Sequence, residues 1–204
     1  MSRKILLTSF QTWQPEQKSN SSDDLLHKIA QDTGSDSLTF LRQLPVNIPE
    51  AASRVIAKIE EVQPDAIICC GMAQNRQTLT VESRATCGNR SYRIRLYSYC
   101  LAICRKLSLN GLEDILPIFL GISGSDSLLI KTPVNLGNLL EGLSNTEISH
   151  EAGKFVCEGL YYEVLKYLRI HNSDIPCIFV HVPILTLKNL PVILADFRLI
   201  IEKI

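Results

Sequence analysis

The chain has 204 residues and a mass of 22.8 kDa, which suits one sizeable domain and is short for two. Its 46% apolar and 21% charged residues exclude a disordered chain, a coiled coil and a collagen-like repeat. Lys plus Arg number 21 and Asp plus Glu number 21, so the net charge is zero and no global field favours nucleic acid or an anionic membrane. No run of 18 apolar residues appears. We therefore expect neither a nucleic-acid nor a membrane partner.

Strands and helices alternate along the chain. Short apolar runs predict strands at 4–9, 38–44, 66–70, 78–81, 146–149 and 175–182. Apolar residues at helical spacing predict helices at 23–31, 48–62, 133–143, 153–170 and 189–204. Continuous apolar strands between helices indicate a sheet that is covered on both faces. The sequence thus predicts one three-layer α/β domain over residues 1–204.

The seven cysteines are an odd number in a chain large enough to build a core without disulfides. This usage predicts a reduced, cytoplasmic protein in which one thiol is reactive and the others are buried and inert. The first ten residues, MSRKILLTSF, contain too few apolar residues for a signal peptide and are interpreted as the first strand.

Cys157 falls in the first turns of a predicted helix, after a short strand and Gly153. A helix N-terminus carries partial positive charge and unpaired N–H groups, so we expect a lowered thiol pKa there and donors for an oxyanion. His181 ends a buried strand, where ligands bind in open α/β sheets, and is the candidate base. Glu82 follows an extended segment and is the candidate carboxylate that orients the imidazole. From the residues alone, a core Cys and a hydrogen-bonded core His are the preferred interpretation, and the catalytic arrangement is the alternative.

Several blocks of sequence resemble one known family in the same order. They are KILLTSF (4–10), RQLPV (42–46), VQPDA (62–66) before Cys70-Gly71, VESRA (81–85), KTPVNL (131–136), AGKFVC (152–157) and FVHVP (179–183). The match extends over about three quarters of the chain as a series of ordered blocks, and it is similar to the pyroglutamyl peptidase I family, the pyrrolidone-carboxylate peptidases of cysteine peptidase family C15. The resemblance implies a three-layer α/β/α sandwich with a mixed, mainly parallel sheet of the phosphorylase/hydrolase-like kind.

The resemblance also implies an activity and a site. Carried over by position, the catalytic residues are Glu82, Cys157 and His181. The apolar pocket for the pyroglutamyl ring is formed by Phe10, Trp13, Phe155 and Val156. The expected substrates are peptides with an N-terminal pyroglutamate, with no cofactor and no metal. A homo-oligomer, either a dimer or a tetramer, is a further expectation.

Two segments depart from the family pattern. The loop TWQPE (12–16) lacks the family's glycines, and Met72 stands where many members have Gln. Residues 87–131 lack the family's Ala-Arg-Ile-Pro-Asp stretch and form a divergent segment. We therefore keep open a non-catalytic relative that acts as a binding module, and a hydrolase for another small amide or ester.

Other motifs favour structural roles. Ser83 to Lys106 contains six cations and three tyrosines and no acid, as a nucleic-acid surface would, but a solvated edge or a subunit contact is the preferred interpretation. The Cys100–Cys104 pair lacks partners for a zinc site, and GISGS (121–125) lacks nucleophile-elbow spacing. Three histidines are expected at the surface; they are His27, His150 and His171. His150 is the reserve candidate for the base because it lies near Cys157 in sequence.

Overall fold

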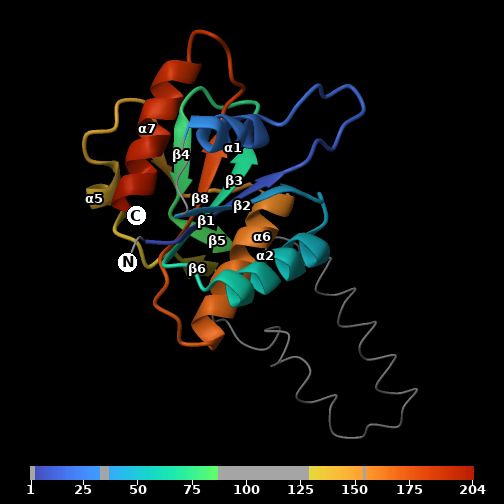
Figure 1. Ribbon diagram of the computed structural model, residues 1–204, viewed down its shortest axis with the longest axis vertical. Helices are drawn as coiled ribbons and strands as arrows, with labels where there is room; N and C mark the ends of the chain where they lie inside the picture. The colour runs from blue at the N-terminus through green and yellow to red at the C-terminus, as the bar shows by residue number, and fades with distance from the viewer. Residues whose placement is uncertain (1–2, 33–36, 87–128, 154) are drawn as a thin grey trace, which may run out of the picture.

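The computed structural model describes residues 3–32, 37–86, 129–153 and 155–204, which form a six-stranded sheet between two helical layers (Figure 1). The strands of this sheet are β1 (Ile5–Phe10), β2 (Leu38–Leu44), β3 (Ala66–Met72), β4 (Leu79–Glu82), β7 (Thr146–Ser149) and β8 (Cys177–Val182). The helices are α1 (Ser21–Asp32), α2 (Ile48–Val62), α5 (Leu136–Leu140), α6 (Val156–Ile170) and α7 (Leu190–Lys203). A separate two-stranded sheet pairs β5 (Arg84–Thr86) with β6 (Leu129–Lys131).

The strand order of the main sheet is β2-β1-β3-β8-β4-β7. Strands β2, β1, β3 and β8 are mutually parallel, whereas β4 runs antiparallel to β8 and pairs in parallel with β7. The sheet is therefore mixed and mainly parallel. With helices on both faces, the expected three-layer α/β/α architecture is confirmed.

Alternate residues of the central strands face opposite layers, because successive side chains of a strand point to opposite faces. Strand β1 shows this clearly: Leu7 packs in the core beneath α1 and α7, while Leu6 packs beneath α2 and α6. The adjacent Cys69 and Cys70 divide in the same way, and both are buried, as expected for core cysteines. Figure 1 shows α1 and α7 on one side of the sheet and α2 and α6 on the other.

Helix boundaries follow local capping and backbone conformation. Helix α2 begins after Asn47, whose side chain accepts a hydrogen bond from the Glu50 N–H, and Pro49 occupies its first turn. The helix expected at 153–170 begins at Val156 because Gly153 has a φ of +91°, which no α-helix accommodates. The helix expected at 133–143 is limited to Leu136–Leu140, with Asn135 as its cap.

The divergent segment is described only at residues 129–131. The Cys100–Cys104 pair, the GISGS motif and most of the basic stretch from Ser83 to Lys106 lie outside the described residues. Within the described residues, no helix is both long enough and apolar enough to cross a bilayer.

Candidate active site

The pairing of β4 with β8 brings Glu82 to His181. Thr80 lies directly opposite His181 in the antiparallel register, so Glu82 lies two residues further along on the same face of the sheet. This face carries α6. The His181 Nδ1–H donates to Glu82 Oε1 at 2.8 Å, and both side chains are buried. With Nδ1 as the donor, the Nε2 atom of the imidazole is free to accept a proton.

Cys157 reaches the same face from α6, of which it is the second residue. Its sulfur lies so close to the end of β3 that a Cβ atom built on Gly71 would be 2.7 Å from Cys157 Sγ and 2.9 Å from Phe179 Cζ. Gly71 pairs with His181 across the parallel β3–β8 ladder. The Phe179 and His181 rings are 4.9 Å apart. Gly71 thus leaves the space that allows the thiol to approach the strand that carries the imidazole.

Burial raises the pKa of the Cys157 thiol to about 12. The backbone N–H of Cys157 and the Arg76 charge lower this pKa, whereas the Glu82 charge raises it, and the loss of hydration outweighs them. The expectation of a lowered thiol pKa at this helix N-terminus is therefore wrong, because a helix end contributes less than removal of the sulfur from water. The resting group is a thiol, so the nucleophile needs a base to take its proton.

Glu82 is held as a carboxylate. Burial alone would raise its pKa, but the hydrogen bond from His181, the nearby Ser149 hydroxyl and the charges of His181 and Arg76 lower it below the usual 4.5. Arg76 Nη1 lies 2.8 Å from the same oxygen, Oε1, that accepts the His181 bond. Sequence reasoning missed Arg76, and the available signal was a lone cation between two buried strands, six residues before Glu82.

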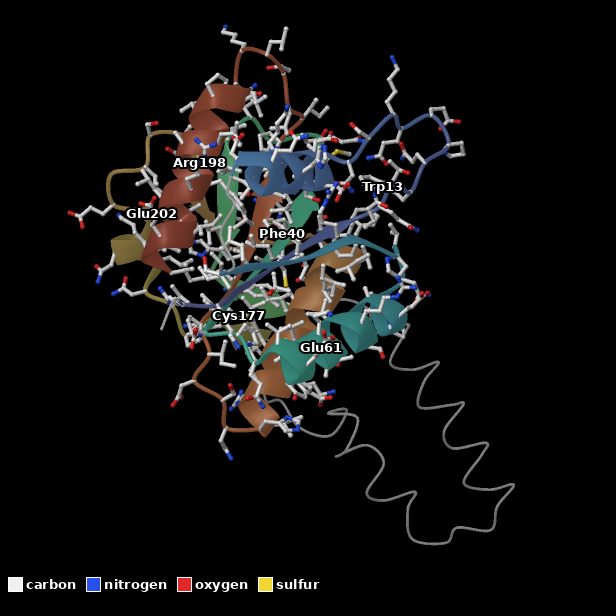
Figure 2. All side chains as sticks on the ribbon, viewed as in Figure 1. Trp13, Phe40, Glu61, Cys177, Arg198 and Glu202 are labelled. Atoms are coloured by element: carbon white, nitrogen blue, oxygen red, sulfur yellow. The ribbon has the colours of Figure 1, made fainter. Side chains whose placement is uncertain are left out.

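A cavity of about 820 Å³ opens beside the thiol and the imidazole, and both line it. All four residues expected to form the apolar pocket also line it: Phe10, Trp13, Phe155 and Val156. Phe10 is buried, while Phe155 is 80% exposed and Trp13 is 43% exposed, so the cavity has a closed end and an apolar rim. Figure 2 shows Trp13 on the long loop that leaves β1.

The loop between β1 and α1 is organised without the family's glycines. Gln17 bridges it, because its Oε1 accepts the Trp13 N–H at 3.1 Å and its Nε2 lies 3.6 Å from Met72 Sδ. Asn20 donates to the Gln11 carbonyl at 3.1 Å, which closes the base of the loop. Met72 lines the cavity and its sulfur also accepts the Ser21 N–H at 3.4 Å. The thioether therefore anchors the loop that carries Trp13.

The remaining titratable candidates lie elsewhere. The three other histidines are all exposed, as expected; they are His27, His150 and His171. The reserve base, His150, does not line the cavity and has its Nδ1 2.7 Å from Ser83 Oγ. Glu158 is buried and accepts hydrogen bonds from Thr86. No group of three or more His, Cys, Asp or Glu side chains in the described ranges could hold a metal ion.

A thiol at a helix start, with an imidazole and a carboxylate on neighbouring strands of an α/β/α sandwich, has the composition of a cysteine hydrolase site. Comparison with known proteins makes this class more specific. Residues 3–95 match the sequence model of the family described as "Pyroglutamyl peptidase". The chain is 28% identical over 185 residues to a pyrrolidone-carboxylate peptidase of Vibrio parahaemolyticus, covering 90% of this chain and 79% of that protein.

A second curated relative, the pyrrolidone-carboxylate peptidase of a Thermoanaerobacter species, is 27% identical over 191 residues, with 92% of this chain and 85% of the relative covered. Among solved structures, pyroglutamyl peptidase I from Bacillus amyloliquefaciens superposes with a TM-score of 0.72 at 20% identity, over 100% of this chain and 95% of that chain. Pyrrolidone carboxyl peptidase from Thermococcus litoralis gives a TM-score of 0.70 at 17% identity, over 98% and 92%. The chain is thus similar in sequence to pyrrolidone-carboxylate peptidases and shares the fold of the pyroglutamyl peptidase structures.

Proposed function

We propose that this protein is a cysteine exopeptidase that hydrolyses the amide bond after an N-terminal pyroglutamyl residue. The observation that carries the proposal is the shared cavity: Cys157 and His181 both line it, and His181 is hydrogen-bonded to the buried Glu82. The substrate class follows from the relatives, which are pyroglutamyl or pyrrolidone-carboxylate peptidases. The expected substrates are therefore peptides that begin with pyroglutamate.

Acylation begins with a neutral thiol. His181 Nε2 takes the proton from Cys157 Sγ as the sulfur attacks the scissile carbonyl carbon, and a C–S bond forms. The carbonyl oxygen becomes an oxyanion that the first N–H groups of α6, including that of Cys157, are placed to bind. The C–N bond then breaks, the imidazolium gives its proton to the leaving amine, and a thioester remains.

Deacylation reverses the proton path. Neutral His181 takes a proton from water, the resulting hydroxide attacks the thioester carbonyl, and the C–S bond breaks with return of the proton to sulfur. Pyroglutamic acid leaves and the thiol is restored. Glu82 accepts the Nδ1–H throughout, so it fixes the tautomer and stabilises the imidazolium of each step.

The cavity suits a small neutral ring. Phe10 and Val156 provide apolar walls near the thiol, and Trp13 and Phe155 lie at the rim. A pyroglutamyl ring is flat and uncharged, with one lactam N–H and one C=O, so an apolar site with a few polar partners suits it. A charged N-terminal ammonium would lose hydration there without an ion-pair partner among the described residues that line the cavity, which disfavours ordinary peptides.

The test is turnover of a pyroglutamyl fluorogenic amide by matched variants. Cys157→Ser and His181→Asn should each lower kcat by about a thousandfold or more, since each removes a member of a unit that acts together. His150→Asn, which alters an exposed histidine outside the cavity, should leave kcat within about twofold. Turnover that survives Cys157→Ser would refute the mechanism. If the wild type does not cleave the pyroglutamyl amide but cleaves another small amide or ester, that compound replaces the proposed substrate. Inactivity on every compound of the panel would favour a binding module.

Three further proposals accompany this one. Residues 1–204 form one peptidase-like domain, the protein is cytoplasmic, and it assembles as a homo-oligomer. The odd cysteine count and the reduced state of the four described cysteines support the cytoplasmic location. Light scattering on the purified chain tests the oligomer, and a monomer at micromolar concentration would refute it.

A further inference from the structure

Arg76 connects two parts of the site that come from distant segments of the chain. Its Nη1 donates to the Thr80 hydroxyl and, at 2.8 Å, to Glu82 Oε1. Its Nη2 donates to Ser149 Oγ at 3.2 Å and to the Glu151 carbonyl at 2.9 Å. One guanidinium therefore bonds both to the carboxylate that orients the imidazole and to the segment that leads into the helix carrying Cys157.

The loop that carries Arg76 is itself held in place. The Ala73 N–H donates to the carbonyl of Val182, at the end of β8, at 2.9 Å, and the Arg76 N–H donates to the Ala73 carbonyl at 3.2 Å. The turn is thus attached to the same strand that carries His181. A planar guanidinium can make several bonds of fixed direction at once, which the single ammonium of a lysine cannot do.

We propose that Arg76 is a positioning residue of the proposed peptidase, one that holds Glu82 in register with His181 and fixes the 149–151 segment that delivers Cys157. This inference rests on the proposed function for its kinetic test but not for its chemical one. Glu82 Oε2 has no hydrogen-bond partner among the described residues, so Oε1 carries the bonds that orient the carboxylate. Without Arg76, the imidazole would be oriented by a carboxylate held from one side only.

The charge of Arg76 has a second effect on the site. Among the described residues that line the cavity, it is the one permanent cation. The charged or titratable groups that face Glu82 are Arg76 from the β3–β4 loop, His181 from β8, and Cys157 and Tyr161 from α6, and Cys69 of β3 faces Cys157 in turn. Arg76 lowers the pKa of the Cys157 thiol, opposing the effect of burial. Removal of this charge should therefore make the thiol harder to ionise.

The kinetic test compares Arg76→Gln and Arg76→Lys with the matched control Arg84→Gln. Arg84 also donates to the 149–151 segment, through the His150 carbonyl at 2.9 Å, but it is not bonded to Glu82. We expect Arg76→Gln to lower kcat about 100-fold with KM changed less than about threefold, because misplacement by about 1 Å costs that much without loss of binding. Arg76→Lys should lower kcat about tenfold, and Arg84→Gln should keep kcat within about threefold of wild type. The acid limb of the rate profile should move to higher pH in Arg76→Gln, because the Arg76 charge lowers the pKa of Glu82 and its loss raises the pH at which that carboxylate takes up a proton.

The chemical test does not require peptidase activity. Iodoacetamide labelling of Cys157, followed by peptide mass mapping at pH 9, should be slower by about threefold or more in Arg76→Gln than in wild type or Arg84→Gln. If no pyroglutamyl amide is cleaved by wild type but this labelling difference appears, the proposed function fails and the role of Arg76 stands. Equal kcat, equal labelling and an unchanged pH profile in Arg76→Gln and Arg84→Gln would overturn it. If Arg76→Gln does not fold, Arg76→Lys decides by the same measures, and failure of both to fold assigns Arg76 to folding and overturns the positioning role.

Discussion

Replacement of Gly71 by alanine tests whether the close approach of α6 to β3 controls the nucleophile. A Cβ at position 71 would lie 2.7 Å from Cys157 Sγ and 2.9 Å from Phe179 Cζ. Contacts between non-bonded heavy atoms are most favourable at about 3.5–4.0 Å, so the sulfur has to move by about 1 Å away from the new Cβ. The Phe179 ring is buried and has little room to move. The expected movement is therefore rotation of the thiol away from His181, together with some strain in the core.

Both consequences have magnitudes. A displaced thiol should lower kcat by about 100-fold, and overpacking against Phe179 should lower the free energy of unfolding by about 1–3 kcal/mol. In a chain of this size that corresponds to a fall in Tm of about 2–12 °C. The assays are turnover of a pyroglutamyl amide and thermal unfolding. Gly137→Ala is the control, because its Cβ would meet only Asn135 Oδ1, at 3.3 Å, and it should keep kcat within about twofold. A Gly71→Ala protein with wild-type Tm and with kcat within about threefold of wild type would show that the approach of α6 to β3 has no role in catalysis.

Three further predictions concern ionisable groups. Glu82→Gln keeps the side-chain shape but offers an amide to His181 Nδ1, and kcat should fall by about 10³–10⁴-fold with the wrong tautomer favoured, as a substrate assay would show. Asp23, paired with Arg42 at 2.8 Å, has a pKa held below 3.8 because hydrogen bonds from Arg42, Ser9 and Gln43 outweigh burial. Asp23→Asn should thus lower the free energy of unfolding, measured in urea at pH 7, by about 3 kcal/mol. The difference from wild type should shrink as the pH falls through the lowered pKa of Asp23, and an equal difference at pH 2 would contradict this sign. Because burial raises the pKa of Cys157 to about 12, its iodoacetamide labelling in the folded protein should still increase between pH 8 and pH 10, and a plateau reached below pH 8 would indicate a thiolate instead.

Local patterns along the chain were sufficient for most elements. The strand at 38–44 and the helix at 48–62 have the bounds expected from apolar periodicity and from Pro49 in the first turn. The errors lie where a single backbone angle or a short pairing decides. Gly153 delays the start of α6 to Val156, and the three-residue strands β5 and β6 pair Arg84 with Lys131, far apart in sequence. No short window of sequence contains that pairing, so periodicity cannot predict it.

The residues of the candidate site could be predicted from the sequence, but the pKa of the thiol could not. Ordered blocks of resemblance led to Cys157, His181 and Glu82 as separate positions. The structure places His181 and Glu82 on the face of the sheet that α6 covers, and Cys157 on α6 itself. The expected reactive thiolate was wrong because thiol ionisation depends on the hydration that the sulfur retains. That hydration depends on how the whole molecule packs, and the position of a cysteine within a predicted helix does not reveal it.

The amino-acid sequence by itself determined the alternation of strands and helices and the chemical groups available for catalysis, because both depend on residue type and on neighbours a few positions away. Only the tertiary structure decided that β4 runs antiparallel to β8, and this direction places Glu82 within 2.8 Å of His181. It also decided that Arg76 joins Glu82 to the segment before Cys157. Contacts between residues so distant along the chain arise from the way whole elements pack, so they are settled when the sheet assembles and not before.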